Sequence, residues 1–305
     1  MRRRGIALFL RSLDNDFQQR VRDDALTTGK RLGFTVTPMG AQNDPVRQLA
    51  QIAAALEAAP GGDLAAILVA PVRDEGLADL AQQAARADIG WTLLNRESAQ
   101  ATLPPFPGDE PARVPAFCVS PDQLEIGRIQ AEQAKVLAPN GGTVIAITGP
   151  ARTSASRRRM EGLWTELGPN YALTLLEADW TTERARLVLD RWLAGLDGST
   201  LPALIAAQND EMALGARQAL RDAASQRGLP ALLDLPLIGC DGSPGLGQRL
   251  VRESRINATV TLPSPAGPAL EWLARFRDTG ELPPSQLSLP VASYPTIKNL
   301  RKTTT

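Results

Sequence analysis

The chain has no histidine, only two cysteines and few aromatic residues, which make up 4% of its 305 positions. Without an imidazole it cannot form a histidine-dependent catalytic triad, a histidine metal site or an imidazole general base. Cys118 and Cys240 are too few for a structural zinc site. Their spacing allows a disulfide but does not require one, so we predict two buried free thiols. No motif indicates a metal or a cofactor, and we expect neither.

The chain also lacks net charge and long apolar runs. Its 33 basic and 33 acidic side chains cancel, which gives no electrostatic reason to expect binding to nucleic acid or to an anionic membrane. The apolar run after Arg2, Arg3 and Arg4 covers only residues 6–10. That is shorter than a signal peptide requires, and far short of the about 20 residues of a membrane span. We expect either a mature exported form or a protein that is not exported.

Short apolar runs alternate with longer segments of helical period in the first part of the chain. Strands are predicted at 5–10, 34–37, 64–70 and 89–94, and helices at 17–32, 45–59 and 75–87. The run at 64–70 is almost continuously apolar, as in a parallel strand that is covered on both faces. This alternation of strand and helix predicts a doubly wound parallel sheet.

A proline-rich segment at 97–115 interrupts the pattern and is predicted to be a loop, after which the alternation begins again. Helices are predicted at 122–137, 156–167, 183–196 and 211–227, and strands at 143–148, 172–176, 203–207 and 237–240. The break near 116–120 is interpreted as a crossover between two similar α/β lobes. Residues 256–262 and 287–291 are candidates for further crossovers, with a helix at 269–277 between them.

Polar and aromatic side chains follow most of the predicted strands. They occur at residues 14–17, 95–96, 149–159, 179–180, 208–210 and 240–241. Ligands of open parallel sheets bind beyond the carboxyl ends of the strands. Amides, carboxylates and guanidinium groups can pair with hydroxyls, and aromatic rings can cover the C–H faces of a sugar. The set therefore predicts a site for a small polyhydroxylated ring.

Several segments carry a resemblance to a known family. The most specific is AQNDEMALGA at 207–216, followed by GPARTSASRRRMEG at 149–162, with weaker matches at 14–17, 239–242, 258–260 and 262–263. On these residues the chain resembles the ribose-binding-protein group of periplasmic sugar receptors, which share their type I fold with the ligand-binding core of lactose-repressor-like regulators.

The resemblance implies two Rossmann-like lobes joined by a hinge of three crossing strands, with the ligand in a cleft between them. We expect one lobe at 1–118 with 262–288, and the other at 119–261 with 289–305. The sugar contacts of the family fall on Asn15, Phe17, Arg96, Arg159, Trp180, Asn209, Asp241 and Thr261.

The sequence departs from the ribose pattern at three positions. Gln18 replaces a second stacking phenylalanine, Asn95 replaces an aspartate beside Arg96, and Cys240 replaces an aromatic residue. Gln18 and Asn95 are still expected among the ligand contacts, and Cys240 is expected to line or underlie the pocket. The changes predict a more polar site, so the ligand could be a pentose, a hexose, a polyol or a sugar acid.

Some of these residues have a second possible role. Asn209 and Asp241 could contact the ligand or cap helices, and Asp210 is the better candidate for a cap. Of three adjacent arginines, 157–159, not all can face one pocket. We expect Arg159 to face it and the other two to lie at the surface or in ion pairs. Phe17 and Trp180, from opposite lobes, are expected to sandwich the ring.

The predicted function is that of a non-enzymatic, monomeric solute-binding protein, which closes around its ligand and serves ABC-type uptake or sensing outside the cytoplasm. A regulator's effector domain is an alternative, but it would need a helix-turn-helix ahead of the first strand. A sensor domain that signals to a membrane receptor also remains open, as does a cytoplasmic location. Glycoside hydrolysis needs a pair of suitably placed carboxylates, and the sequence shows no pair whose placement requires this role. The glycines at 239–247 do not fit a dinucleotide fingerprint.

Overall fold

The computed structural model describes residues 3–96, 113–196 and 201–303. The chain folds into two compact units. Unit 1 comprises residues 1–121 and 263–289, and unit 2 comprises residues 122–262 and 290–305. The chain therefore passes between the units three times, after Pro121, Leu262 and Leu289. The boundaries expected after 118, 261 and 288 lie slightly earlier in the chain.

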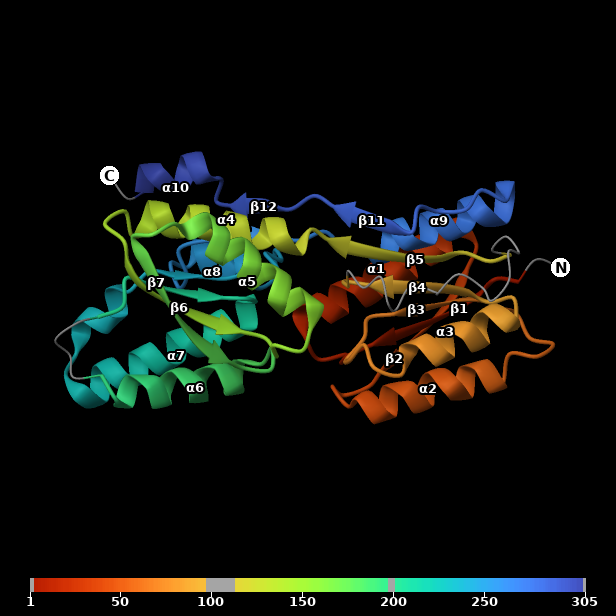
Figure 1. The fold of residues 1–305 in the computed structure, drawn as a ribbon, viewed down its shortest axis with the longest axis horizontal. Helices are drawn as coiled ribbons and strands as arrows, with labels where there is room; N and C mark the ends of the chain where they lie inside the picture. The colour runs from red at the N-terminus through yellow and green to blue at the C-terminus, as the bar shows by residue number, and fades with distance from the viewer. Residues whose placement is uncertain (1–2, 97–112, 197–200, 304–305) are drawn as a thin grey trace. The chain divides into compact units, whose positions relative to one another are not determined.

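Unit 1 is built on a six-stranded parallel sheet in the order β11-β5-β4-β3-β1-β2. Its strands are β1 (Gly5–Leu10), β2 (Thr35–Gly40), β3 (Leu64–Val69), β4 (Gly90–Leu94), β5 (Ala116–Pro121) and β11 (Gln286–Leu289). One face packs on α1 (Asp16–Leu32) and α9 (Ala266–Thr279), and the other on α2 (Pro45–Glu57) and α3 (Leu77–Arg86) (Figure 1). Because helices cover both faces, the central strands are apolar along nearly their whole length.

Unit 2 has a four-stranded parallel sheet in the order β7-β6-β8-β9. The strands are β6 (Gly142–Thr148), β7 (Tyr171–Glu177), β8 (Leu204–Ala207) and β9 (Leu237–Ile238). Helices α4 (Gln123–Leu137) and α5 (Ser154–Leu167) cover one face, and α6 (Thr182–Ala194) and α7 (Asp210–Arg227) the other (Figure 1). Strands β10 (Thr259–Thr261) and β12 (Ala292–Tyr294) form a separate antiparallel pair.

Residues 116–120, interpreted as a crossover, lie directly before the first passage between the units, but they are a strand that was not predicted. They form β5, which lies between β4 and β11 in the sheet of unit 1, and the chain leaves the unit only after this strand. The strand is hard to recognise because its apolar run is short and Pro115 and Pro121 flank it. Three short helices were not predicted either: the 3₁₀ helix Pro230–Asp234, α8 (Gly247–Arg252) and α10 (Ile297–Thr303). The loop predicted at 97–115 lies, up to residue 112, outside the described residues.

Each sheet has one point where the order of its strands reverses. In unit 1 the chain goes from β1 to β2 on one side and then to β3 on the other, and in unit 2 it goes from β6 to β7 and then to β8. Loops that leave neighbouring strands in opposite directions open a crevice at such a point, where ligands of open α/β sheets bind. The loops after β1 and β3, and those after β6 and β8, are therefore the places to look for a site. In the described residues, no helix is long and apolar enough to span a membrane.

Candidate functional site

In unit 1, the loop after β1 and the first turn of α1 hold three of the predicted contacts. Asn15 is the N-cap of α1, and its side chain accepts a hydrogen bond from the Gln18 backbone N–H at 3.2 Å. The Gln18 side chain in turn accepts one from the Arg11 N–H at 3.3 Å. Phe17 and Gln18 are both buried. This loop is therefore fixed by its own hydrogen bonds, and a ligand role for Asn15, Phe17 and Gln18 stays a prediction.

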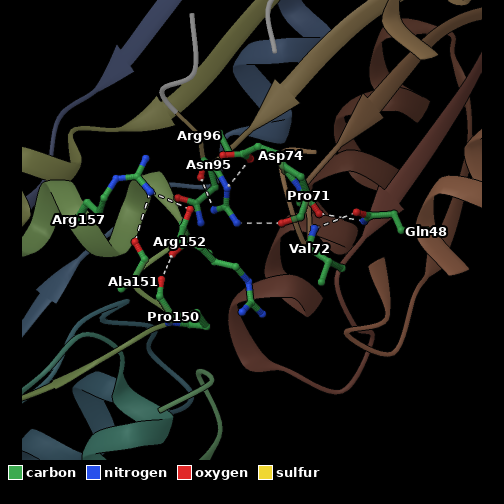
Figure 2. A network of polar contacts seen from close by, with 12 residues as sticks. Gln48, Pro71, Val72, Asp74, Asn95, Arg96, Pro150, Ala151, Arg152 and Arg157 are labelled. Atoms are coloured by element: carbon green, nitrogen blue, oxygen red, sulfur yellow. Dashed lines mark hydrogen bonds and ion pairs between the residues drawn. The ribbon is translucent and has the colours of Figure 1, made fainter. Parts of the chain in front are cut away.

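The loop after β4 places Asn95 and Arg96, with Asn95 in the left-handed backbone region at φ 57°. The Arg96 guanidinium is 2% exposed. It donates hydrogen bonds to the Asn95 carbonyl at 3.0 Å and to the Pro71 carbonyl at 2.9 Å, and its Nε lies 3.4 Å from the Asp74 carboxylate (Figure 2). Arg96 thus connects the loop after β4 to the loop after β3, independently of any contact with a ligand.

The loop after β3, which begins at Ala70, was missed by the sequence analysis. Gln48 of α2, which is buried, donates to the Ala70 carbonyl at 3.1 Å and accepts from the Val72 N–H at 2.8 Å (Figure 2). With the Arg96 bond to Pro71, two buried side chains hold three successive residues of this loop. The signal was present in the sequence, since Arg73 and Asp74 follow the most apolar of the predicted strands.

In unit 2, the centre of the candidate site is Arg159 of α5, which is 2% exposed. Its Nε donates to the Gln123 side chain at 2.8 Å, and its Nη1 donates to the Gln208 carbonyl. Its guanidinium carbon lies 5.6 Å from the centre of the Trp180 ring. The described residues offer no acceptor for Nη2, so donors remain for a ligand.

The two arginines before Arg159 face outward, as predicted. Arg158 pairs with Glu161 at 2.8 Å, and Arg157 is exposed and donates to the carbonyls of Ala151 and Arg152 (Figure 2). The helical period of α5 separates them from Arg159 because residues one and two positions apart point in different directions.

Trp180 is held against the loop after β6. Its ring lies over Gly149, where a Cβ would stand 2.0 Å from a ring carbon. Gly149 itself donates to the Gln208 side chain at 2.9 Å, and Gln208 donates back to the Ser156 carbonyl at 3.0 Å. The side-chain amide of Gln208 therefore fixes the loop on which the indole rests.

We expect the Gly149→Ala change to displace the Trp180 ring and weaken ligand binding several-fold. The new methyl group overlaps the indole, which costs about 1–3 kcal/mol of unfolding free energy when a packed region cannot relax. Urea unfolding and calorimetric titration measure the two effects. Gly195→Ala is the matched control, because a Cβ there would lie at an ordinary 3.6 Å from the Trp192 carbonyl oxygen. Equal binding by both variants would contradict the expected contact between Trp180 and the ligand.

The prediction that Asp210 caps α7 is wrong. Asn209 is the N-cap: its side chain accepts from the Met212 N–H at 2.8 Å and donates to the Trp180 carbonyl at 3.0 Å. The buried Asp210 carboxylate instead accepts from the Gly242 N–H and the Thr259 hydroxyl, both at 2.7 Å. Asp210 therefore anchors the segment that carries Asp241.

Asp241 follows β9 and has a backbone φ of 101°, which is unusual for a residue other than glycine. Its N–H donates to the Val260 carbonyl at 3.0 Å, and it forms an isolated bridge with Thr261. The Thr261 hydroxyl donates to the Ala292 carbonyl at 3.0 Å. The neighbouring Cys240 is fully buried, and this burial raises the pKa of its thiol. Cys118 and Cys240 are both buried and free, as predicted.

The predicted contacts thus fall into two groups, one in each unit, which are named half-sites after their predicted role. The unit 1 half-site has Asn15, Phe17 and Gln18 at the start of α1, and Asn95 and Arg96 on the loop after β4. The unit 2 half-site joins Arg159, Trp180 and Asn209 by direct contacts, and Asp241 and Thr261 lie on the adjoining segments. Among the described residues, no cluster of three or more cysteines, aspartates and glutamates could hold a metal ion.

Comparison with known proteins gives a consistent result. Residues 6–266 match the model of a family described as the periplasmic binding protein domain. The ribose import binding protein of Salmonella typhimurium is 27% identical over 270 residues, which cover 86% of this chain and 80% of that protein.

Two solved structures have the same fold. The Caulobacter myo-inositol binding protein superposes with a TM-score of 0.79 at 24% identity, covering 98% of this chain and 95% of that one. A solute binding protein of an ABC transporter from Actinobacillus succinogenes, solved with bound D-allose, has a TM-score of 0.80 at 22% identity, covering 97% of this chain and 99% of that one.

Proposed function

Since this chain belongs to the periplasmic binding protein domain family, we propose that it is a solute-binding protein for a monosaccharide or polyol, with ligand contacts from both half-sites. The relatives' names support this ligand class: one imports ribose, and two solved proteins carry myo-inositol or D-allose. The proposed contacts are the ten residues of the two half-sites, with Arg96, Arg159 and Asp241 as the charged members.

The single observation that carries the proposal is the arrangement around Arg159. A buried guanidinium with unused N–H donors lies beside an indole face, at the carboxyl edge of a parallel sheet. Burying a charged group is costly unless its donors are used. A ring with hydroxyls on its edge and C–H groups on its face satisfies both the guanidinium and the indole.

A thermal-shift screen with D-ribose, D-allose, D-fructose and myo-inositol tests the proposal. A ligand at 100 times its Kd stabilises the folded protein by about 2.7 kcal/mol, which raises the unfolding midpoint measurably. Calorimetric titration then confirms each hit. If no member of this panel, nor of a wider set of pentoses, hexoses, polyols and sugar acids, shifts the midpoint, the proposal is wrong.

The proposed role is delivery of the ligand to an ABC permease outside the cytoplasm, without chemical change of the ligand. The names of the relatives, an import protein and a transporter component, support the role in uptake. Incubation with aryl glycosides and with the bound sugar checks the non-enzymatic part. We expect to recover the sugar unchanged. Turnover by the wild-type protein that disappears in the Arg159→Ala variant would contradict this expectation.

A further inference from the structure

This inference rests on the proposed function and concerns the ligand contacts of unit 1. We propose that Asp74, in the loop after β3, supplies the carboxylate of the unit 1 half-site and accepts a hydrogen bond from a ligand hydroxyl. This residue is not among the contacts predicted from the sequence. Its assignment comes from its place in the fold and from the state of its carboxylate oxygens.

The place is the reversal point of the unit 1 sheet. β3 lies between β1 and β4, so the loop of Asp74 leaves the sheet between the loops that carry Asn15 and Arg96. All three loops lie at the carboxyl edge because the three strands are parallel. Ligands of such sheets bind where the strand order reverses, and Asp74 is the acidic residue that the third loop places there.

The carboxylate of Asp74 retains acceptor capacity. Its Oδ1 lies 3.4 Å from the Nε of Arg96 and is buried, yet it accepts no hydrogen bond from the residues that the structure describes. The side chain as a whole is 28% exposed, so it is reachable from outside the unit. The buried Oδ1 faces the Arg96 guanidinium, and the exposed part of the carboxylate is free to accept a hydrogen bond from a hydroxyl of a bound sugar.

The loop is already rigid without Asp74. Gln48 holds Ala70 and Val72, and Arg96 holds Pro71 through its carbonyl (Figure 2). The carboxylate is therefore not needed to keep the loop in place, which leaves charge balance for Arg96 and contact with the ligand as its roles. The position directly before Arg96 carries an amide, Asn95, so this half-site obtains its carboxylate from the neighbouring loop.

The test is the Asp74→Asn variant, titrated by calorimetry with whichever sugar of the panel above binds the wild-type protein most tightly. The amide keeps the shape but loses the charge, so we expect Kd to rise about 10- to 150-fold, the range for a hydrogen bond to a charged group. Because the carboxylate also balances the charge of the buried Arg96, the unfolding midpoint without ligand should fall as well, and Kd is measured on the folded variant. Glu75→Gln, an exposed neighbour with the same change of charge, should leave Kd unchanged.

A double variant, Asp74→Asn with Asn95→Asp, tests whether the carboxylate itself is what matters. Asn95 has a φ of 57°, a conformation that aspartate also tolerates, so the second change returns a carboxylate beside Arg96 without new strain. We expect it to recover most of the lost affinity. Monodeoxy analogues of the same sugar add an independent measure. The analogue that lacks the bonded hydroxyl should bind the wild-type protein more weakly than the parent sugar does. The Asp74→Asn variant should bind this analogue and the parent sugar with nearly equal Kd.

The outcomes separate the two proposals. If the wild-type protein binds no sugar or polyol, the proposed function fails. If it binds and Asp74→Asn binds equally well, the inference alone is overturned. A fall in the unfolding midpoint with unchanged Kd would also overturn it, because it would give Asp74 a structural role only.

Discussion

Replacing Arg159 by alanine is expected to abolish ligand-induced stabilisation. Hydrogen bonds to a charged group contribute about 1.5–3 kcal/mol each, so the loss of two such bonds raises Kd more than about 100-fold. The side chain also supplies donors to Gln123 and to the Gln208 carbonyl. The unfolding midpoint without ligand should therefore fall too, and each ligand-induced shift must be measured from the variant's own midpoint.

Arg158→Ala is the matched control for this result. It removes an arginine from the adjacent position of the same helix, but one that is exposed and paired with Glu161. Its ligand-induced shift should equal that of the wild-type protein. If Arg159→Ala is folded by circular dichroism and still binds the sugar with similar Kd, the unit 2 half-site has been assigned wrongly.

Replacing Asp241 by glycine is expected to abolish binding without destabilising the fold. At φ 101° the backbone of this aspartate is strained, at a cost of about 1–3 kcal/mol. Glycine relieves that strain, although the unfolded chain gains about 0.4–1 kcal/mol of conformational freedom. The unfolding free energy in urea should stay the same or rise by up to about 2 kcal/mol, while calorimetry detects no binding.

The control for the backbone effect is Ser254→Gly, which relieves a positive φ of 54° at a residue outside both half-sites. It should give a comparable change in unfolding free energy and leave Kd unaltered. If the Asp241→Gly variant still binds the ligand, the assignment of Asp241 to the site is wrong. One that unfolds much more easily would show that the strained conformation has a structural rather than a ligand-related cause.

The alternation of strands and helices could be predicted because most elements are long and strongly patterned. The period of α5 also excluded that all three arginines of 157–159 face one pocket, and the family resemblance favoured Arg159. What could not be predicted depends on neighbours distant in the sequence. Strand β5 is recognisable only by its pairing with β4 and β11. Asn209 rather than Asp210 caps α7 because the Asp210 carboxylate finds donors on Gly242 and Thr259, 32 and 49 positions away.

Asp74 shows the same limit for the candidate site. The sequence shows that Asp74 follows a predicted strand, but neither Gln48 nor Arg96 reveals from its own surroundings that it binds that turn. Only the strand order shows that the loop leaves the sheet where the winding direction changes. Loops of this kind can be assigned from sequence once the order of strands is known, and not before.

The three passages of the chain between the units have a consequence for biosynthesis. The sheet of unit 1 is completed by β11, a strand made after nearly the whole of unit 2 has left the ribosome. Until Gln286–Leu289 emerges, β5 presents an unpaired edge with buried apolar residues beside it, and such edges promote aggregation. The nascent protein therefore needs β11, or a chaperone in its place, to cover the edge of a strand that is synthesised long before it.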